Sequence, residues 1–286
     1  MHASPRAPIA DLFLGISSLL TRKRIPLAIA TLSFAMLLAV GSAAVQFKVL
    51  HIENGIMSEF SLDRDELRTT VDTDLMAISE MDVSEFMEMS GFRFGSEAVQ
   101  EQPSGEHKVG LTYLRRVSPY VFMQMLFNIV VMFCAGVFFL LLFSGGSQSA
   151  YETARRLPGY IFPMCGLVIW MLVRSLIWIP LVGPAIALYM LPRLSLAPVY
   201  LASGEAGVFE SLHLSMRRTS GHWVSMFLRL VLIGIVAVLI LWPMLVLVVG
   251  ASLLSAKLGY ILFLLAIIFI LAFQCAGLTV LAVMMA

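Results

Sequence analysis

Three arginines inside long hydrophobic stretches, Arg174, Arg193 and Arg229, are the residues best placed to do chemistry in this chain. A charged side chain within a membrane-spanning segment is costly, so one found there usually contacts an anion or lines a polar cavity. Arg174 and Arg229 lie near the ends of their stretches, from which a long side chain can extend to the membrane interface. Arg193 lies farther from an end, so it is the strongest candidate of the three.

Arg193 is expected near the middle of the membrane. If residues 185–202 form one straight helix, Arg193 lies about 14 Å from its inner end. Pro192 and Pro198 also deprive the carbonyls of residues 188 and 194 of their usual helical donors. We predict that Arg193 contacts an anionic lipid headgroup or lines a polar cavity. The alternative is a structural clamp, in which the arginine bonds those freed carbonyls.

Two further arginines, Arg217 and Arg218, end a short amphipathic segment that precedes a hydrophobic stretch. Basic groups in this position suit the anionic headgroups at a membrane surface. Together with Arg193 and Arg229, they are the predicted contacts for lipid or another anion.

The acidic residues are confined to one part of the chain. Fourteen of the eighteen Asp and Glu residues fall between Glu53 and Glu106, and no hydrophobic stretch contains a carboxylate. This removes the residue type that most proton- and sodium-coupled transporters need within the bilayer. Four acids, Asp63, Asp65, Asp72 and Asp74, suggest calcium, but they lack the glycine and terminal glutamate of a calcium loop. We interpret them as a solvated acidic face and predict no metal site.

Motifs for catalysis are missing from the sequence. It has no phosphate-binding loop, nucleotide fingerprint or nucleophile elbow, and the three cysteines, Cys134, Cys165 and Cys275, lie in apolar runs. The net charge of +1 argues against a nucleic-acid-binding protein, which needs a concentrated basic face. We therefore expect no enzyme activity, no catalytic residue, no cofactor and no nucleic-acid partner.

The composition predicts the elements that position these residues. The chain is 59% hydrophobic and 13% charged, far from the norm for soluble domains. We predict an all-α, polytopic membrane helix bundle of six transmembrane helices, with interfacial amphipathic helices and one extramembrane acidic insert. The uncharged run at 25–47 is long enough to be a retained first span rather than a signal peptide. The other spans are predicted at about 119–143, 160–179, 185–202, 223–245 and 258–285.

The stretch from 160 to 202 allows a second interpretation. Two prolines and a glycine in the segment Pro180-Leu-Val-Gly-Pro184 disfavour a continuous helix, which is why we divide the stretch there. In the five-span alternative, residues 160–202 form one kinked helix or a partly re-entrant element.

Basic leaders precede three spans, at 11–24, 149–156 and 208–218. The first and third have an apolar face and are predicted to be interfacial helices, whereas the second reads as an ordinary basic flank. If the leaders are cytoplasmic, eight basic residues lie close to the cytoplasmic ends of the spans and four lie close to the opposite ends. Because short cytoplasmic segments carry an excess of Lys and Arg, this count predicts that both termini are cytoplasmic.

The chain thus divides into a leader with the first span (1–47), an extramembrane acidic insert (48–117) and a membrane bundle (118–286). Within the insert, Ser61 resembles a helix start, and an apolar stripe runs from Leu62 to Met81. The insert is therefore predicted to be partly helical, with a loop near 95–110.

Three segments carry a resemblance to a known family. They are Leu194-Ser-Leu-Ala-Pro-Val-Tyr-Leu201, Gly207-Val-Phe-Glu-Ser211 and Ser215-Met-Arg-Arg-Thr219. They resemble the YciC-like family of uncharacterised bacterial inner-membrane proteins, and more broadly the membrane domain attached to some glycerophosphodiester phosphodiesterases. The resemblance implies a six-span plasma-membrane protein. The hydrolytic domain found beside the related membrane domain is absent from this chain.

Two functions remain after these exclusions. The first is a non-enzymatic integral inner-membrane protein of the cell envelope that engages membrane lipids, anionic ones above all, or an envelope protein partner through residues 48–117. The alternative is a carrier or channel for a lipid or neutral solute, which would use broken helices near 180–198.

Overall fold

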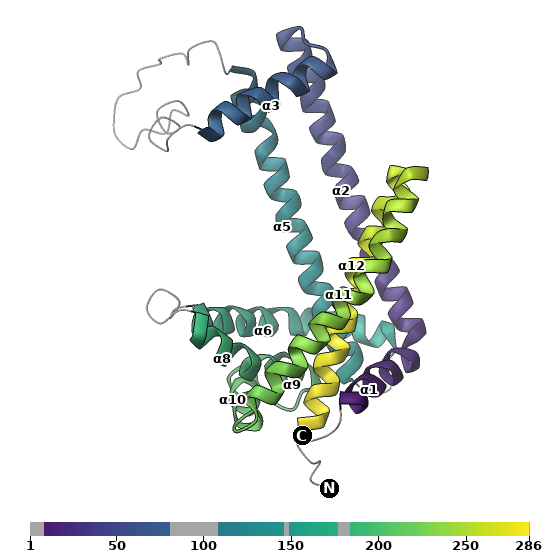
Figure 1. The fold of residues 1–286 in the computed structure, drawn as a ribbon, viewed down its shortest axis with the longest axis vertical. Helices are drawn as coiled ribbons and strands as arrows, with labels where there is room; N and C mark the ends of the chain where they lie inside the picture. The colour runs from purple at the N-terminus through teal and green to yellow at the C-terminus, as the bar shows by residue number, and fades with distance from the viewer. Residues whose placement is uncertain (1–8, 81–107, 146–148, 177–183, 286) are drawn as a thin grey trace, which may run out of the picture. The chain divides into compact units, whose positions relative to one another are not determined.

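The computed structural model describes residues 9–80, 108–145, 149–176 and 184–285, and all of the regular structure in these ranges is α-helix. The chain divides into two compact units: unit 1 comprises residues 1–39 and 130–286, and unit 2 comprises residues 40–129. Figure 1 labels the helices. Their bounds are α1 Ile9–Arg22, α2 Arg24–Phe60, α3 Arg64–Glu80, α5 Lys108–Ser144, α6 Ala150–Leu176, α8 Pro184–Leu194, α9 Ala197–Ser203, α10 Val208–Arg218, α11 Trp223–Leu254 and α12 Ala256–Met285.

Five of these helices, α2, α5, α6, α11 and α12, are long and apolar enough to cross a membrane. The chain is therefore an all-α, multi-pass integral membrane protein. Helices α2, α5, α11 and α12 contain the spans predicted at 25–47, 119–143, 223–245 and 258–285. Helix α2 has 37 residues, which corresponds to about 55 Å and exceeds the thickness of the hydrocarbon core. It therefore continues well beyond the predicted end of the first span.

The prediction of a single span at 185–202 is wrong. The segment forms two short helices, α8 with 11 residues and α9 with 7, separated by Ser195 and Leu196. Pro198 lies in the first turn of α9, where a proline is tolerated because its missing N–H is not needed. An 11-residue helix is only about 16 Å long and cannot cross the hydrocarbon core. The predicted break at 180–184 lies mostly outside the described residues.

Unit 2 is built from α3 together with the parts of α2 and α5 that fall within residues 40–129. Ile56, Leu67 and Val71 form its buried core, so the predicted apolar stripe of the insert faces inward at Leu67 and Val71. Helix α3 is capped by Asp63, whose carboxylate accepts the N–H of Glu66 at 2.7 Å, and not by Ser61 as predicted. Ser61 instead has a left-handed φ of 55° at the turn after α2. In the described part of the insert, residues 48–60, 64–80 and 108–117 are helical.

Polar bonds join α2 and α3 to α5 within unit 2. The Asp74 carboxylate accepts the N–H of Gly110, in the first turn of α5, at 2.7 Å. The Tyr113 hydroxyl donates to Glu53, and Arg116 pairs with Glu59 at 2.7 Å. A side chain at Gly110 would overlap Asp74, so the absence of a Cβ there permits the close approach.

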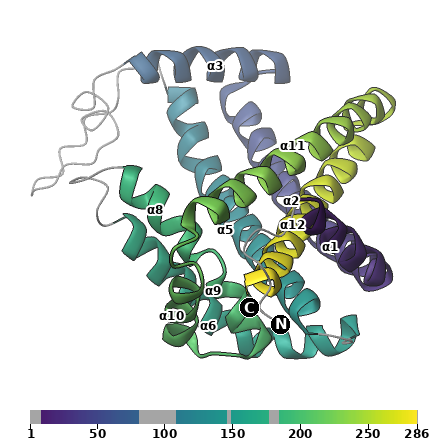
Figure 2. The ribbon, with the colours of Figure 1, turned by 60° about the horizontal axis from the view of Figure 1, so that its bottom comes forward.

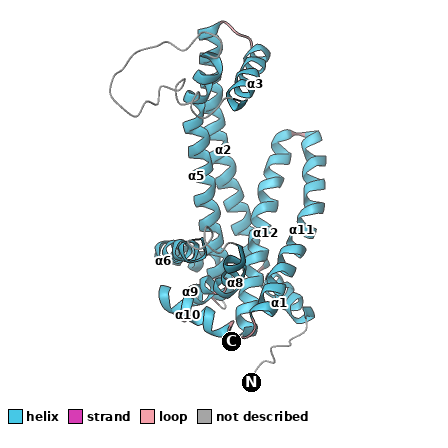
Figure 3. Ribbon diagram, turned by 60° about the vertical axis from the view of Figure 1, so that its left-hand side comes forward, coloured by secondary structure: helices cyan, strands magenta, loops and turns pink. Residues whose placement is uncertain are grey.

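Unit 1 contains a helical hairpin of α11 and α12, which reverses at Ser255. Figure 3 shows the two helices side by side. Gly277 of α12 lies against Ile233 of α11, and small residues of this kind let membrane helices approach closely. Helix α1 packs on α12, with Leu12 and Ile16 fully buried. The first leader is thus an amphipathic helix, as predicted, and part of its apolar face is covered by protein.

Unit 1 also contains a cluster of α6, α8, α9 and α10, which contact one another (Figure 2). Helix α6 runs crosswise to α12 in Figures 1 and 3. Its start is fixed by a capping box, in which Ser149 and Glu152 each accept the other's backbone N–H. The second leader therefore forms the first turns of α6. The same helix covers residues 160–176 of the span predicted at 160–179, and the last three residues of that span lie outside the described residues.

Candidate functional site

The turn between α9 and α10 lies beside a small pocket. Helix α9 ends at Gly204, whose φ of 75° is left-handed and suits a residue without a side chain. Helix α10 begins after Gly207, whose N–H is accepted by the Glu210 carboxylate at 3.4 Å. This four-residue connection brings the end of α9 beside the last turn of α10.

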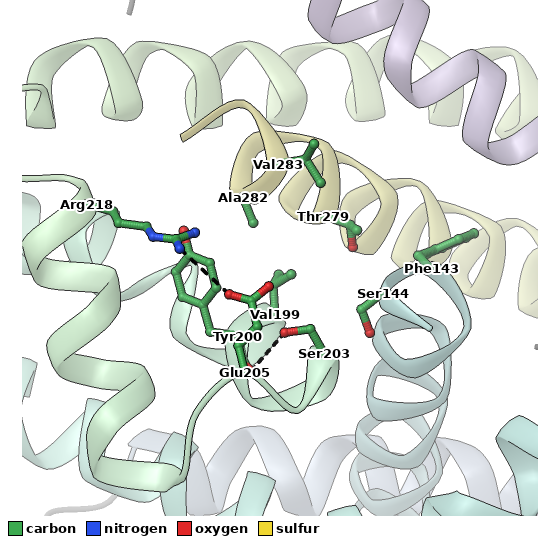
Figure 4. Close-up of a pocket in the computed structure, with 10 residues that line it drawn as sticks. All are labelled: Phe143, Ser144, Val199, Tyr200, Ser203, Glu205, Arg218, Thr279, Ala282 and Val283. Carbon is green, nitrogen blue, oxygen red and sulfur yellow. Dashed lines mark hydrogen bonds and ion pairs between the residues drawn. The ribbon is translucent and has the colours of Figure 1, made fainter. Parts of the chain in front are cut away.

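The pocket has a volume of about 170 Å³ and lies between α5, α9, α10 and α12, all within unit 1 (Figure 4). Its lining combines one cation, one carboxylate and several hydroxyls with apolar side chains. The residues are Phe143, Ser144, Val199, Tyr200, Ser203, Glu205, Arg218, Thr279, Ala282 and Val283.

Arg218, Tyr200 and Glu205 form the polar wall of the pocket. The guanidinium of Arg218 lies over the Tyr200 ring, 4.9 Å from its centroid. The same guanidinium faces the Glu205 carboxylate, with Nη2 and Oε2 3.8 Å apart. In Figure 4 these three side chains converge on one side, and α12 and the end of α5 supply the other side.

Two donors in this wall are buried without a partner. Within the described residues, neither the Tyr200 hydroxyl nor Nη1 of Arg218 has a partner with the distance and angles of a hydrogen bond, although the Arg218 guanidinium lies close enough to the phenol to lower its pKa. Tyr200 is only 2% exposed, so bulk water does not solvate it freely. A buried polar group left without a hydrogen bond costs about 1–3 kcal/mol. A site that keeps two such donors at the edge of a pocket is prepared for a ligand that accepts hydrogen bonds.

The chemistry of the Tyr200 hydroxyl favours donation to such a ligand. Burial raises its pKa, and the neighbouring Arg218 cation offsets only part of that rise. The phenol therefore stays protonated at neutral pH and keeps its hydrogen available.

The other hydroxyls of the pocket are already engaged as donors. Ser144 donates to the carbonyl of Leu140, Ser203 to that of Tyr200, and Thr279 to that of Cys275. Their oxygens can still accept, but the hydrogens that an anion needs come from Arg218 and Tyr200. A guanidinium fork matches carboxylate and phosphate oxygens geometrically, so the wall has the chemistry of an anion site.

Of the four predicted contact residues, only Arg218 lines this pocket. Its neighbour Arg217 is exposed on α10. Arg229 is only 7% exposed, so its side chain is packed within unit 1 and does not extend from the surface as expected. Arg174 is half-buried in the last turn of α6.

Arg193 lies at the joint between α8 and α10. Its Nη1 donates to the Tyr189 hydroxyl at 2.6 Å, and its Nη2 donates to the Met216 carbonyl at 3.1 Å. The Ser215 hydroxyl returns a bond to the Arg193 carbonyl at 2.5 Å. These bonds make Arg193 a structural clamp between α8 and α10. The carbonyl that accepts from the guanidinium is that of Met216 in α10, and not one of the carbonyls freed by the prolines.

The third leader forms helix α10, as predicted, but a different face is buried. Ser211, Leu212 and Ser215 face the protein, whereas Phe209 is exposed and contacts the Trp170 ring edge-on at 6.0 Å. The buried serines let α10 lie close to its neighbours, which places Arg218 beside α9.

Sequence reasoning missed Tyr200 and Glu205 as site residues. Both lie in or beside the segments that carry the family resemblance. The short Gly204–Gly207 connection could have indicated that two helix ends meet there.

Among residues placed by the structure, no three His, Cys, Asp or Glu side chains form a group that could hold a metal ion.

Comparisons with models of protein families, with curated proteins and with solved structures found no match to this chain. The resemblance to the YciC-like family therefore stays a prediction.

Proposed function

We propose that this protein is a non-enzymatic integral membrane protein that binds the phosphate of an anionic lipid headgroup at the Arg218–Tyr200 pocket. The observation that carries the proposal is the pair of buried donors without partners at the edge of that pocket. A phosphate offers several acceptor oxygens at once and can satisfy both donors.

The size of the pocket favours a headgroup over a whole lipid. A volume of about 170 Å³ is well below the roughly 300–1,000 Å³ of sites that enclose a drug-sized ligand. Val283, at the edge of the pocket, is 71% exposed and offers apolar surface for an acyl chain outside it. A lipid would then place its phosphate inside and its hydrocarbon over α12.

The proposal includes a membrane topology. We place α2, α5, α11 and α12 across the membrane and keep α6 and α8 on the cytoplasmic side as a hairpin that does not cross. The short α8 and the crosswise course of α6 support this arrangement. An even number of crossings keeps both termini in the cytoplasm, as the basic bias of the leaders predicts. The pocket then faces the leaflet whose anionic lipids attract basic groups.

The bacterial plasma membrane, as the location, rests on the resemblance to the YciC-like family. In this orientation, residues 48–117 lie on the outer side of the membrane, where their acidic side chains are available to an envelope protein partner. We propose that contact as a separate role of residues 48–117.

Lipid that co-purifies with the protein tests the proposed site. Arg218→Gln and Tyr200→Phe each remove one of the two donors, and both are expected to lower the amount of bound anionic phospholipid. Arg217→Gln is the matched control, because it removes the same charge from the adjacent, exposed position on α10. Equal lipid loss in Arg217→Gln and Arg218→Gln would show that only general surface charge matters.

A carrier or channel for a lipid or neutral solute is the second candidate. The observation that favours it is the break between α8 and α9, because discontinuous helices line many transport pathways. Flux of a lipid or neutral solute through proteoliposomes that contain the purified protein, absent from empty vesicles, would support this candidate over simple binding.

A further inference from the structure

We infer that Glu205 is an internal counter-ion of the pocket, which stands in for the ligand when the site is empty and is displaced when a lipid phosphate binds. This inference rests on the proposed function and adds that Glu205 competes with the lipid phosphate for Arg218. Glu205 supplies the one carboxylate in the lining of the pocket.

The position of Glu205 allows it to move. It directly follows Gly204, in the four-residue connection between α9 and α10, and its side chain is 50% exposed. Because it lies in this connection and not in a helix, displacing it breaks no helical hydrogen bond. The Arg218 side chain is only 26% exposed and is held over the Tyr200 ring, so it stays in place as the fixed partner.

The contact between Glu205 and Arg218 is incomplete. Their closest nitrogen and oxygen atoms are 3.8 Å apart, too far for a hydrogen bond, which for this type of pair is about 2.7–2.9 Å long. The pair thus neutralises charge without using the hydrogens of the guanidinium. Nη1 of Arg218 and the Tyr200 hydroxyl are both left for another acceptor.

A phosphate that enters this pocket meets the Glu205 carboxylate as a like charge. Two negative charges at one cation repel each other strongly where water is partly excluded. The phosphate can bind both Arg218 and Tyr200, whereas Glu205 reaches neither with a hydrogen bond in this structure. The phosphate therefore makes more hydrogen bonds in the pocket than Glu205 does. Glu205 still lowers the apparent affinity for the phosphate, because it competes for the charge of Arg218.

This arrangement gives the site a function beyond holding a lipid. A competing carboxylate keeps the arginine neutralised while no lipid is bound, and it excludes weakly binding anions. On binding, the connection between α9 and α10 is released from Arg218. Lipid binding in the pocket therefore changes the position of this exposed connection.

The test compares variants of the full-length protein in neutral detergent. Native mass spectrometry measures the affinity for phosphatidylglycerol, and inorganic phosphate is titrated in parallel. Glu205→Gln, which removes the charge and keeps the size, is expected to bind phosphatidylglycerol on the order of tenfold more tightly. Glu205→Ala should tighten binding similarly. Asp11→Asn, at an exposed position of α1 outside the pocket lining, is the charge-matched control and should leave affinity unchanged.

The outcomes separate this inference from the proposed function. If Arg218→Gln weakens binding but both Glu205 variants bind no more tightly than the original protein, Glu205 orients the arginine and the competitor role is overturned. If neither Arg218→Gln nor the Glu205 variants change affinity, the proposed lipid site itself is wrong. A response to inorganic phosphate as strong as that to phosphatidylglycerol would overturn a lipid as the source of the phosphate.

Discussion

The bond between Asp74 and Gly110 is expected to hold unit 2 together. The buried Asp74 carboxylate accepts an N–H in the first turn of α5, across a separation of 36 residues, and so ties α3 to α5. A hydrogen bond to a charged group contributes about 1.5–3 kcal/mol, and a negative charge at a helix N-terminus adds about 0.3–1 kcal/mol. Asp74→Ala removes both contributions and leaves the Gly110 N–H without its acceptor.

We predict that Asp74→Ala lowers the local stability of unit 2 by about 2 kcal/mol. Since 1.4 kcal/mol corresponds to a factor of ten, the opening equilibrium should rise by about 30-fold. Hydrogen–deuterium exchange of full-length protein in detergent measures this in peptides that cover α3 and the first turns of α5. Exchange in α11 and α12, which belong to unit 1, should not change.

Asp72→Ala is the control for this measurement. Asp72 lies two residues earlier on the same helix, carries the same charge and is exposed. If both variants speed exchange equally, the effect comes from helix charge or propensity, and the role assigned to the Asp74–Gly110 bond is refuted. If neither variant changes exchange, unit 2 does not depend on that bond.

Two further predictions concern the clamp and the topology. Arg193→Gln loses the bonds to Tyr189 and Met216, worth about 2 kcal/mol, and should lower the thermal unfolding midpoint by roughly 4–8 °C. The amount of bound lipid should not change. A loss of bound lipid with unchanged stability would instead make Arg193 the lipid contact. In a cysteine-free background in intact cells, an impermeant thiol reagent should label Ser104→Cys but neither Ser147→Cys nor Val182→Cys. Labelling at Val182 would mean that α6 crosses the membrane, and labelling at Ser147 but not Ser104 would reverse the orientation.

The helices and most spans follow from sequence because they depend on local, periodic properties. Uncharged runs long enough to cross hydrocarbon located α2, α5, α11 and α12, and a helical stripe located α1 and α10. The continuation of α2 as far as Phe60 was harder to foresee, since nothing in a polar stretch after a span requires the helix to stop or to continue. Its reason is tertiary: Ile56 packs against Leu67 and Val71 of α3.

The error at 185–202 has a specific cause. Hydropathy measures whether a segment is apolar, and the segment is apolar whether it crosses the membrane or packs against protein. Leu194, Leu196 and Tyr200 are fully or almost fully buried within unit 1, so their apolar character serves the protein core. Pro192 and Pro198, which were read as weak points in a span, flank the actual break between α8 and α9.

The site could be predicted only in part. The cation, Arg218, was found because a basic residue after an amphipathic segment is a recognisable pattern. Its partners, Tyr200 and Glu205, could not be assigned, because their distance from Arg218 depends on how the Gly204–Gly207 connection folds back. Arg193 shows the converse: a charge in an apolar stretch indicated a special role, but only the position of α10 shows that it bonds Met216.

The most direct test of the central claim is the amount of anionic phospholipid that co-purifies with Arg218→Gln compared with Arg217→Gln. Both variants lose one positive charge from the last turn of α10, but only Arg218 reaches the pocket. The lipid is extracted from protein purified gently in the same detergent and quantified per protein molecule. The account predicts that Arg218→Gln retains much less anionic phospholipid than Arg217→Gln, which should match the unmodified protein. Equal retention by the two variants would contradict it.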